Sequence, residues 1–421
     1  MHGKQHSQNS LGISRATMTV LGIVFVLAII LVFTQPAQAQ TFQVIHNFAG
    51  RPDGGDPIAG LTLDAAGNLY GTTLGGGSLH GYGSVFKLAH RGSGWVLTPL
   101  HDFTGTGGDG VYPWAGVTFG PNGTLYGTTM QGGGGADYGT VFNLQPPPNA
   151  PASALYPWTE TVIHEFSGMP NDGANPYYGK LVFDQAGNLY DTTVYGGAHG
   201  VGAVYELTPS DGGWTESVIY SFGEGGNDGT GPWSGVIFDQ AGNLYGTTFW
   251  SSGWGTVYEL TPSGSGWTEQ ILHNFQNGND GAWPIGGLLL GPSGNLYGTT
   301  STGGINGGGT VFELQPTQGG WTYTLLYSFT GQGGPEASLT MDAGGSLYGT
   351  TYYDGAYGWG SIFKLTPSNG GWTYTSLHDF TGGNDGSRPI SDVIFDGQGN
   401  LYGTASLDGA NRQGVIWEIT P

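Results

Sequence analysis

Apolar and polar residues alternate along short stretches of this chain, and glycine-rich connections separate the stretches. Between residues 235 and 275, GVIFD places Val236 and Phe238 on one face, and neighbouring residues of TVYELTP (256–262) fall on opposite faces. A third such stretch is WTEQILHNF (267–275). A period of two residues indicates β-strands, and no helical period interrupts it. With NLYGTT, this segment predicts four short strands joined by tight connections.

The octet AGNLYGTT (241–248) recurs in close copies six more times. The copies are spaced about 51 to 64 residues apart, and each contains one tyrosine: Tyr70, Tyr126, Tyr190, Tyr245, Tyr297, Tyr348 and Tyr402. A steady period of this length is the signature of a repeat architecture. Four strands repeated seven times are typical of a β-propeller, in which small sheets stand radially around a channel.

The ends of the repeat region predict how the ring closes. TFQVIHNF (41–48) matches the fourth strand of the unit, and GVIWEITP (414–421) matches the third. Seven complete sets arise only if these two segments share one sheet, which also removes exposed strand edges. We therefore expect an all-β fold, a seven-bladed propeller of four-stranded blades over residues 40–421, closed by strand 41–48 pairing with strand 414–421.

Residues 1–39 differ from the rest of the chain. Lys4 and Arg15 precede an apolar run from Ala16 to Phe33, and Ala37-Gln38-Ala39 follows as an A-x-A cleavage signature. This pattern predicts a signal peptide that is cut before Gln40. The 18-residue run is also long enough to remain as an N-terminal signal anchor. Either interpretation places the propeller outside the cytoplasm, secreted or at the cell surface.

Composition narrows the classes of partner. The chain has 9 basic and 30 acidic residues, a net charge of −21, and no cysteine. Such a surface repels nucleic acid and anionic lipid, and thiolate chemistry is not available. We expect a monomer that contacts a membrane only through an uncleaved N-terminal segment.

The combination D-x-x-G-N-L-Y-G-T-T, G-T-V-F-E-L-T-P and W-T-E-T, followed by N-D-G, resembles the GloVer tandem repeat of choice-of-anchor bacterial surface proteins. The resemblance covers residues 41–421 and implies an exported protein that is attached to the cell by a terminal anchor. No sorting segment follows the last strand here, which departs from that pattern. The D-x-x-G-N-L-Y turn is also similar to the NHL propeller repeat, which supports the fold and says little about activity.

The loops between the fourth strand and the next first strand carry an acid in six of seven units. Together with the loops between second and third strands they are expected on one face. A ring of these carboxylates near a channel mouth could bind calcium, with Asp109, Asp172, Asp228, Asp280 and Asp385 as ligands and Asp53 in the equivalent place. The other interpretation is that N-D-G is a turn in which Asp accepts bonds from its own backbone.

Large aromatic residues are expected on the same face. Rings flanked by acids and amides suit neutral polysaccharide, because the apolar face of a sugar stacks on a ring while hydroxyl groups meet polar groups. The candidate ligand-binding residues are Trp114, Trp233, Trp283, Trp250, Trp254, Tyr352, Tyr353 and Trp359. Packing between neighbouring blades is the alternative role for these rings.

Histidine recurs on the fourth strands as His46, His101, His164, His273 and His378, with Tyr220 and Tyr327 in the matching places. Because these strands are outermost, the histidines cannot converge on one ion, and we expect them to form structural hydrogen bonds.

Three functions remain open from sequence. The first is a non-catalytic binding or surface-interaction module, with no assigned catalytic residue and no cofactor apart from calcium. The second is a carbohydrate-active hydrolase or lyase that uses loop carboxylates, for which Asp191 and Asp354 are candidates. The third is a purely structural repeat protein.

Overall fold

The computed structural model describes residues 40–77, 80–92, 94–147, 158–226, 228–250, 253–264 and 266–421. The expected signal peptide (1–39) lies outside these residues. Over the part of the chain that is described, no helix has the length and apolar character needed to cross a membrane.

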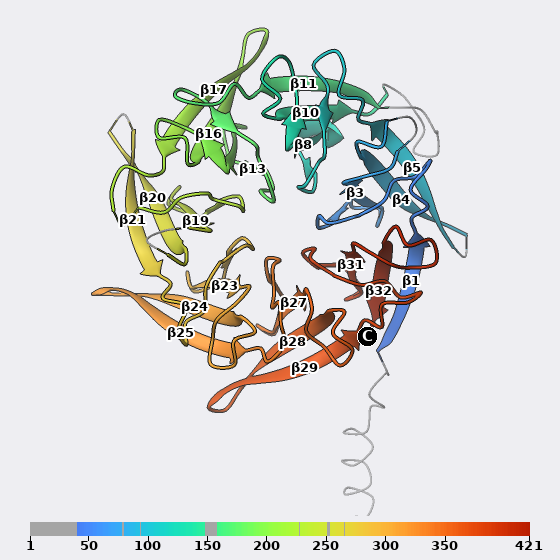
Figure 1. Cartoon of the computed structure of the whole chain (residues 1–421), viewed down its shortest axis with the longest axis vertical. Coiled ribbons are helices and arrows are strands. Elements are labelled where there is room, and N and C mark those ends of the chain that lie inside the picture. Colours follow the sequence, from blue (N-terminus) through green and yellow to red (C-terminus); the bar gives the residue numbers. More distant parts are fainter. Residues whose placement is uncertain are drawn as a thin grey trace, which may run out of the picture. The chain divides into compact units, whose positions relative to one another are not determined.

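The described residues of the 42–420 unit form seven four-stranded antiparallel sheets arranged as blades around a ring (Figure 1). Strands are given from the first strand outward. Blade 1 contains β2 (Thr62–Leu63), β3 (Leu69–Thr73), β4 (Ser84–Arg91) and β5 (Gly94–Asp102), and blade 2 contains β7 (Thr118–Phe119), β8 (Leu125–Thr129), β10 (Thr140–Gln145) and β11 (Thr159–Glu165). Blade 3 contains β13 (Val182–Phe183), β14 (Leu189–Thr193), β16 (Ala203–Ser210) and β17 (Gly213–Ser221).

Blade 4 contains β18 (Ile237–Phe238), β19 (Leu244–Thr248), β20 (Thr256–Ser263) and β21 (Gly266–Asn274). Blade 5 contains β22 (Leu289–Leu290), β23 (Leu296–Thr300), β24 (Thr310–Thr317) and β25 (Gly320–Ser328). Blade 6 contains β26 (Thr340–Met341), β27 (Leu347–Thr351), β28 (Ser361–Ser368) and β29 (Gly371–Asp379). Blade 7 contains β30 (Ile394–Phe395), β31 (Leu401–Ala405), β32 (Val415–Thr420) and β1 (Thr41–Asn47). Two loop ribbons, β6 (Gly110–Val111) with β9 (Gln131–Gly132) and β12 (Gly173–Ala174) with β15 (Tyr195–Gly196), and a 3-10 turn, Pro121–Gly123, complete the described elements.

The predicted closure is confirmed, because β1 lies beside β32 as the outer strand of blade 7 (Figure 1). The amide of Phe48 donates to the carbonyl of Gly414 at 3.1 Å. Thr404 in blade 7 donates its hydroxyl to the carbonyl of Ala59 in blade 1 at 3.3 Å. Segments from the two ends of the propeller are therefore joined both within a sheet and between sheets.

The repeated octet forms the turn and second strand of each blade and also joins neighbouring blades. In blade 4, Asp239 accepts bonds from the amides of Ala241 and Asn243, and Gly242 has a φ of 88°, which suits a residue without Cβ. The hydroxyl of Tyr245 reaches Asp239 at 3.1 Å. Thr247 donates across the boundary to the carbonyl of Pro284 at 3.2 Å.

The hydrophobic cores lie between blades. One cluster combines Tyr245 and Val257 of blade 4 with Leu296 and Phe312 of blade 5, all buried. Burying a side chain of this size stabilises the fold by about 2 to 3 kcal/mol. Because each blade buries its faces only against its neighbours, the ring is stable as a closed whole.

Candidate functional site at the channel mouth

Loops from all seven blades surround a cavity of about 500 Å³ at one end of the central channel. Its walls combine aromatic rings with three charged side chains. The lining residues that matter for recognition are Asp56, Trp114, Tyr178, Trp233, Phe249, Trp283, Glu336, Tyr352 and Arg388.

A shared backbone feature holds three of these side chains in place. Asp56, Trp283 and Arg388 each precede a proline and have left-handed φ values of 52°, 57° and 54°. A residue with a Cβ in this region costs about 1 to 2 kcal/mol, so the surroundings must hold it there. For Trp283, the amide donates to the carbonyl of Trp254 at 2.9 Å, and its carbonyl accepts from Ser301 at 3.1 Å. The backbone that carries each side chain is thereby fixed to two neighbouring loops.

Over blades 2 to 5 the rings form a continuous belt. Trp114 stacks on Tyr177 with ring centroids 4.4 Å apart, and Tyr177 meets the edge of Trp233 at 5.0 Å. Trp233 stacks on Phe249 at 4.1 Å, and Phe249 stacks on Trp283 at 5.7 Å. The rings of Trp114, Trp233 and Trp283 therefore pack between blades, as considered from sequence, and they also line the cavity.

Blades 6 and 7 contribute a charged wall. The guanidinium of Arg388 lies over the rings of Tyr352 and Tyr353, 5.4 and 5.2 Å from their centroids. Its Nε is buried and has no hydrogen-bond partner among the described residues. Burial raises the pKa of Glu336 to about 7, and burial also raises the pKa of Asp56. The wall can therefore both donate to and accept from a polar ligand near neutral pH.

A second cavity of about 520 Å³ opens beside the mouth and shares Trp233 with it. Asn175, Tyr177 and Tyr195 also line it, and Tyr195 is half exposed. The two cavities give the mouth a side groove between blades 2 and 3.

The predicted aromatic residues divide between lining and support. Trp114, Trp233, Trp283 and Tyr352 line the mouth cavity. Trp250, Trp254 and Tyr353 are not among its lining residues, but each contacts a lining ring. The remaining one, Trp359, is exposed and has Gly382 near its ring.

The loop aspartates have a different location from the one expected. Among the described residues that line the mouth, none is Asp109, Asp172, Asp228, Asp280 or Asp385. Four of them lie beside histidines of the outer strands, with Nε2 to carboxylate distances of 3.4 Å for His101–Asp109, 3.2 Å for His164–Asp172, 3.1 Å for His273–Asp280 and 3.1 Å for His378–Asp385. The expected ring around the mouth is thus replaced by separate pairs at the blade boundaries, because the loop turns back toward the strand that precedes it.

These aspartates also hold their own loops. Asp280 accepts from the amide of Gln276 at 3.0 Å, and Asp385 accepts from the amide of Thr381 at 2.9 Å. Such bonds are those of the expected N-D-G turn. The expected structural hydrogen bonds of the histidines are confirmed as well, including His46 to Asp53 at 3.0 Å.

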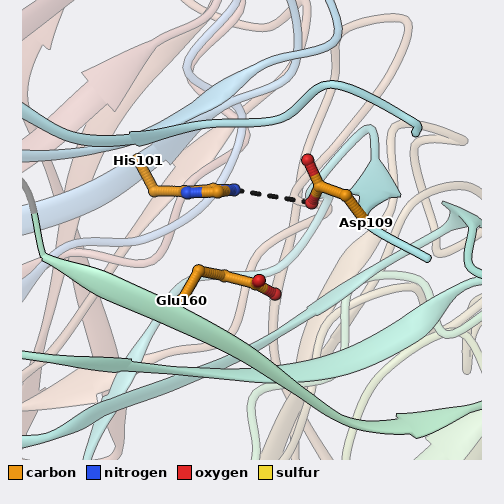
Figure 2. A group of neighbouring side chains, drawn as sticks. All are labelled: His101, Asp109 and Glu160. Carbon is orange, nitrogen blue, oxygen red and sulfur yellow. Dashed lines mark hydrogen bonds and ion pairs between the residues drawn. The ribbon is translucent and has the colours of Figure 1, made fainter. Parts of the chain in front are cut away.

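At two boundaries a glutamate of the next outer strand completes a group of three ligand-type side chains. These groups are His101, Asp109 and Glu160, shown in Figure 2, and His164, Asp172 and Glu216. In each group one donor atom per residue lies within 4.8 Å of the other two. Burial, with a contribution from the neighbouring aspartate, raises the pKa of Glu160 and of Glu216 to about 7. Sequence reasoning missed these glutamates, although the repeated W-T-E at the start of the fourth strand was a signal for them.

Asp191, the one acid that replaces the glycine of the octet, is fully buried. Neither of its carboxylate oxygens has a hydrogen-bond partner in the described part of the chain, and burial raises its pKa to about 7. A Cβ on Gly179 would clash with this carboxylate, with Oδ1 only 2.0 Å away, so glycine there leaves the carboxylate room. Asp191 is therefore enclosed rather than presented to a polymer.

Solved structures with a similar fold share little sequence with this chain. The extracellular domain of a protein described as a one-component system from B. thetaiotaomicron has 11% identity and a TM-score of 0.54, over 90% of this chain and 40% of that one. A gluconolactonase from Xanthomonas campestris has 13% identity and a TM-score of 0.40, over 90% and 89%. PorZ, a surface component of the type-IX secretion system of Porphyromonas gingivalis, has 16% identity and a TM-score of 0.46, over 87% and 46%. These likenesses concern the fold alone.

No curated protein matches the sequence. The repeat itself does have a match: residues 30–162 and 249–421 fit the Gloeobacter/Verrucomicrobia repeat, most of the chain and both ends of the closed ring. This match agrees with the seven octets and with the four-stranded blades that they build. The chain therefore belongs to the Gloeobacter/Verrucomicrobia repeat family.

Proposed function

We propose that this protein is an exported, non-catalytic binding module whose channel mouth binds neutral polysaccharide. The observation that carries the proposal is the convergence of Trp114, Trp233 and Trp283, from three blades, on one cavity that also contains Glu336 and Arg388. Sugar rings stack their C–H faces on aromatic side chains, and their hydroxyl groups exchange hydrogen bonds with carboxylate and guanidinium groups. The side groove at Tyr195 gives room for a second sugar unit of a polymer.

The test is a glycan array followed by calorimetric titration of the best neutral polysaccharide. Because stacking on an aromatic ring contributes about 1.4 kcal/mol, Trp233→Ala and Trp283→Ala should each weaken binding about tenfold. Tyr357→Ala is the matched control, because this ring is exposed and lines neither cavity. An array without any bound glycan, or a titration unchanged by both tryptophan variants, would refute the proposal.

One observation favours a second candidate, a carbohydrate-active hydrolase or lyase. Glu336 and Asp56 line the same cavity, and burial raises the pKa of both carboxyl groups, as general acid catalysis requires. Asp191, considered for this role from sequence, is enclosed, so the pair in the cavity is the better candidate. Release of reducing ends or unsaturated products that Glu336→Gln abolishes would favour the enzyme. Unchanged polysaccharide after long incubation would favour the binding module.

Export to the cell surface is part of the proposal. It rests on the A-x-A signature before Gln40 and on the family of the repeat. Cell fractionation with N-terminal sequencing tests it: a chain that begins at Gln40 supports cleavage, a retained leader in the membrane fraction supports an anchor, and a cytoplasmic chain refutes export.

A further inference from the structure

We propose that His101, Asp109 and Glu160, and likewise His164, Asp172 and Glu216, form two binding sites for a divalent transition-metal ion such as Zn²⁺. The sites lie at successive blade boundaries, 1/2 and 2/3, away from the channel mouth. Each takes a histidine from the outer strand of one blade, an aspartate from the following loop, and a glutamate from the outer strand of the next blade.

The donor set fits such an ion. One imidazole nitrogen and two carboxylate oxygens are ligands that Zn²⁺ accepts at about 2.0 to 2.2 Å, with a fourth position left for water. Tetrahedral bonds of that length place donors about 3.4 Å apart. The three donor atoms of each group lie within 4.8 Å of one another, so closure requires only a small adjustment of flexible side chains. Figure 2 shows the carboxylates of Asp109 and Glu160 and the imidazole of His101 directed toward a common space.

The aspartates are already oriented for this role. Asp109 uses Oδ2 to accept from the amide of Thr104 at 2.6 Å and from its hydroxyl at 2.7 Å. Asp172 uses Oδ2 in the same way with Ser167, at 2.7 and 2.9 Å. In both residues Oδ1 is the atom that faces the histidine. Hydrogen bonds that fix a ligand from behind are a regular feature of metal sites.

A second observation supports a cation at these two sites. Oε1 of Glu160 and Oε1 of Glu216 are buried and have no hydrogen-bond partner among the residues described. A buried carboxylate oxygen beside another carboxylate is costly unless a proton or a cation lies between them.

Other blade boundaries do not have the complete set of histidine, aspartate and glutamate. At boundary 4/5, Tyr323 takes the place of the glutamate and stacks on His273 with centroids 4.5 Å apart. At boundary 3/4, Tyr220 takes the place of the histidine and donates to Glu269 at 3.0 Å. Each of these boundaries lacks one of the three ligands, so we expect two metal ions per chain.

The experiment uses the full chain, stripped with a chelator and dialysed against Zn²⁺, with bound metal measured by elemental analysis. We expect two zinc ions per chain, one in Glu160→Gln, one in Glu216→Gln and none in the double variant. Glu269→Gln and His273→Gln are matched controls and should retain two. Co²⁺ should report the same sites by its visible absorption, with half the signal in each single variant.

Folding is checked separately, because unfolded chains also lose metal. In chelator, each glutamine variant should retain its circular dichroism and unfold at a temperature no lower than the parent's. Zn²⁺ should raise the unfolding temperature of the parent but not of the double variant. The proposal is overturned if the folded parent binds no zinc or if the folded double variant binds as much as the parent. Loss of zinc from the control variants would overturn it as well.

Discussion

Boundaries 1/2 and 2/3 of the propeller share their backbone design with boundaries 4/5 and 6/7, yet one residue of the outer strand makes them chemically different. At the first two boundaries Glu160 and Glu216 face a histidine–aspartate pair. At the other two, Tyr323 and Phe42 stack on the histidine, with ring centroids 4.5 and 3.6 Å apart. The same backbone thus holds either a histidine with two carboxylates, the proposed cation site, or a histidine that is covered by an aromatic ring.

The difference shows at which position the sequence of a repeat can vary without a change in the sheet. Strand pairing is the same at both kinds of boundary, since Glu216 pairs with Leu207 as Tyr323 pairs with Leu314. The residue concerned points between blades, so a substitution there changes the boundary and leaves the sheet hydrogen bonds intact. A repeat can in this way gain a site at one boundary without altering the ring.

The largest test converts an aromatic boundary into a glutamate boundary. Phe42→Glu removes the stack on His378 and the contact with Phe380, and it places a carboxylate beside Asp385, so we expect a loss of about 3 kcal/mol in the free energy of unfolding in chelator. Zn²⁺ should restore part of this loss, because the variant gains the third ligand. Urea unfolding with and without zinc measures both effects.

Phe42→Leu is the control for that variant, because Leu97 occupies the equivalent place at boundary 7/1. We expect it to lose only about 1 kcal/mol and to show no recovery with zinc. Equal losses in both variants, without any recovery, would mean that the residue acts through packing alone.

The sequence predicted the ring and its closure because both depend on patterns that lie within one repeat. The octet contains the turn, the second strand and the Tyr245 and Thr247 contacts, so its repetition was enough to place the blades. The sequence did not predict that the loop aspartates lie beside histidines, because no spacing shows that the loop turns Asp280 back toward His273. Glu160 was missed because its partners belong to the neighbouring blade.

The channel mouth was predicted in part for a similar reason. Trp233 and Trp283 were expected on one loop face and both line the mouth cavity, but their position there depends on loop backbone. The left-handed φ of Trp283 and Arg388, each before a proline, is rare for residues with a Cβ, and only the bonds to adjacent loops reveal it. Sequence therefore indicated which rings share a face and not which of them line the cavity.

A medium effect should appear at boundary 3/4, which carries an acid pair without histidine. Burial and the charge of Asp228 raise the pKa of Glu269 to about 8 from its usual 4.5. The contribution of this group to the free energy of unfolding is therefore fully present below pH 4.5. That contribution is lost as the pH rises from 4.5 to about 8, because the unfolded chain releases the proton first. Allowing for solvent screening of a partly exposed group, we expect a loss of about 2 kcal/mol.

Glu269→Gln should flatten the pH dependence over that window, measured by urea unfolding at pH 5 and pH 8. Glu224→Gln is the matched control, because Glu224 is an exposed carboxylate in the same loop region. A slope that persists in Glu269→Gln, or that disappears in Glu224→Gln, would assign the effect to another group.

The smallest effect runs in the opposite direction and converts a glutamate boundary into an aromatic one. Glu216→Tyr should place a ring against His164, as Tyr323 does against His273, with its hydroxyl near the carbonyl of Asp172 in the way that Tyr323 donates to Asp280 at 2.8 Å. Removing the unpartnered carboxylate and adding the stack should raise the free energy of unfolding in chelator by about 1 kcal/mol. The variant should also bind one zinc ion fewer than the parent. A lower free energy of unfolding in chelator would contradict this expectation. It would show that the Glu216 carboxylate stabilises the metal-free boundary more than the tyrosine ring does.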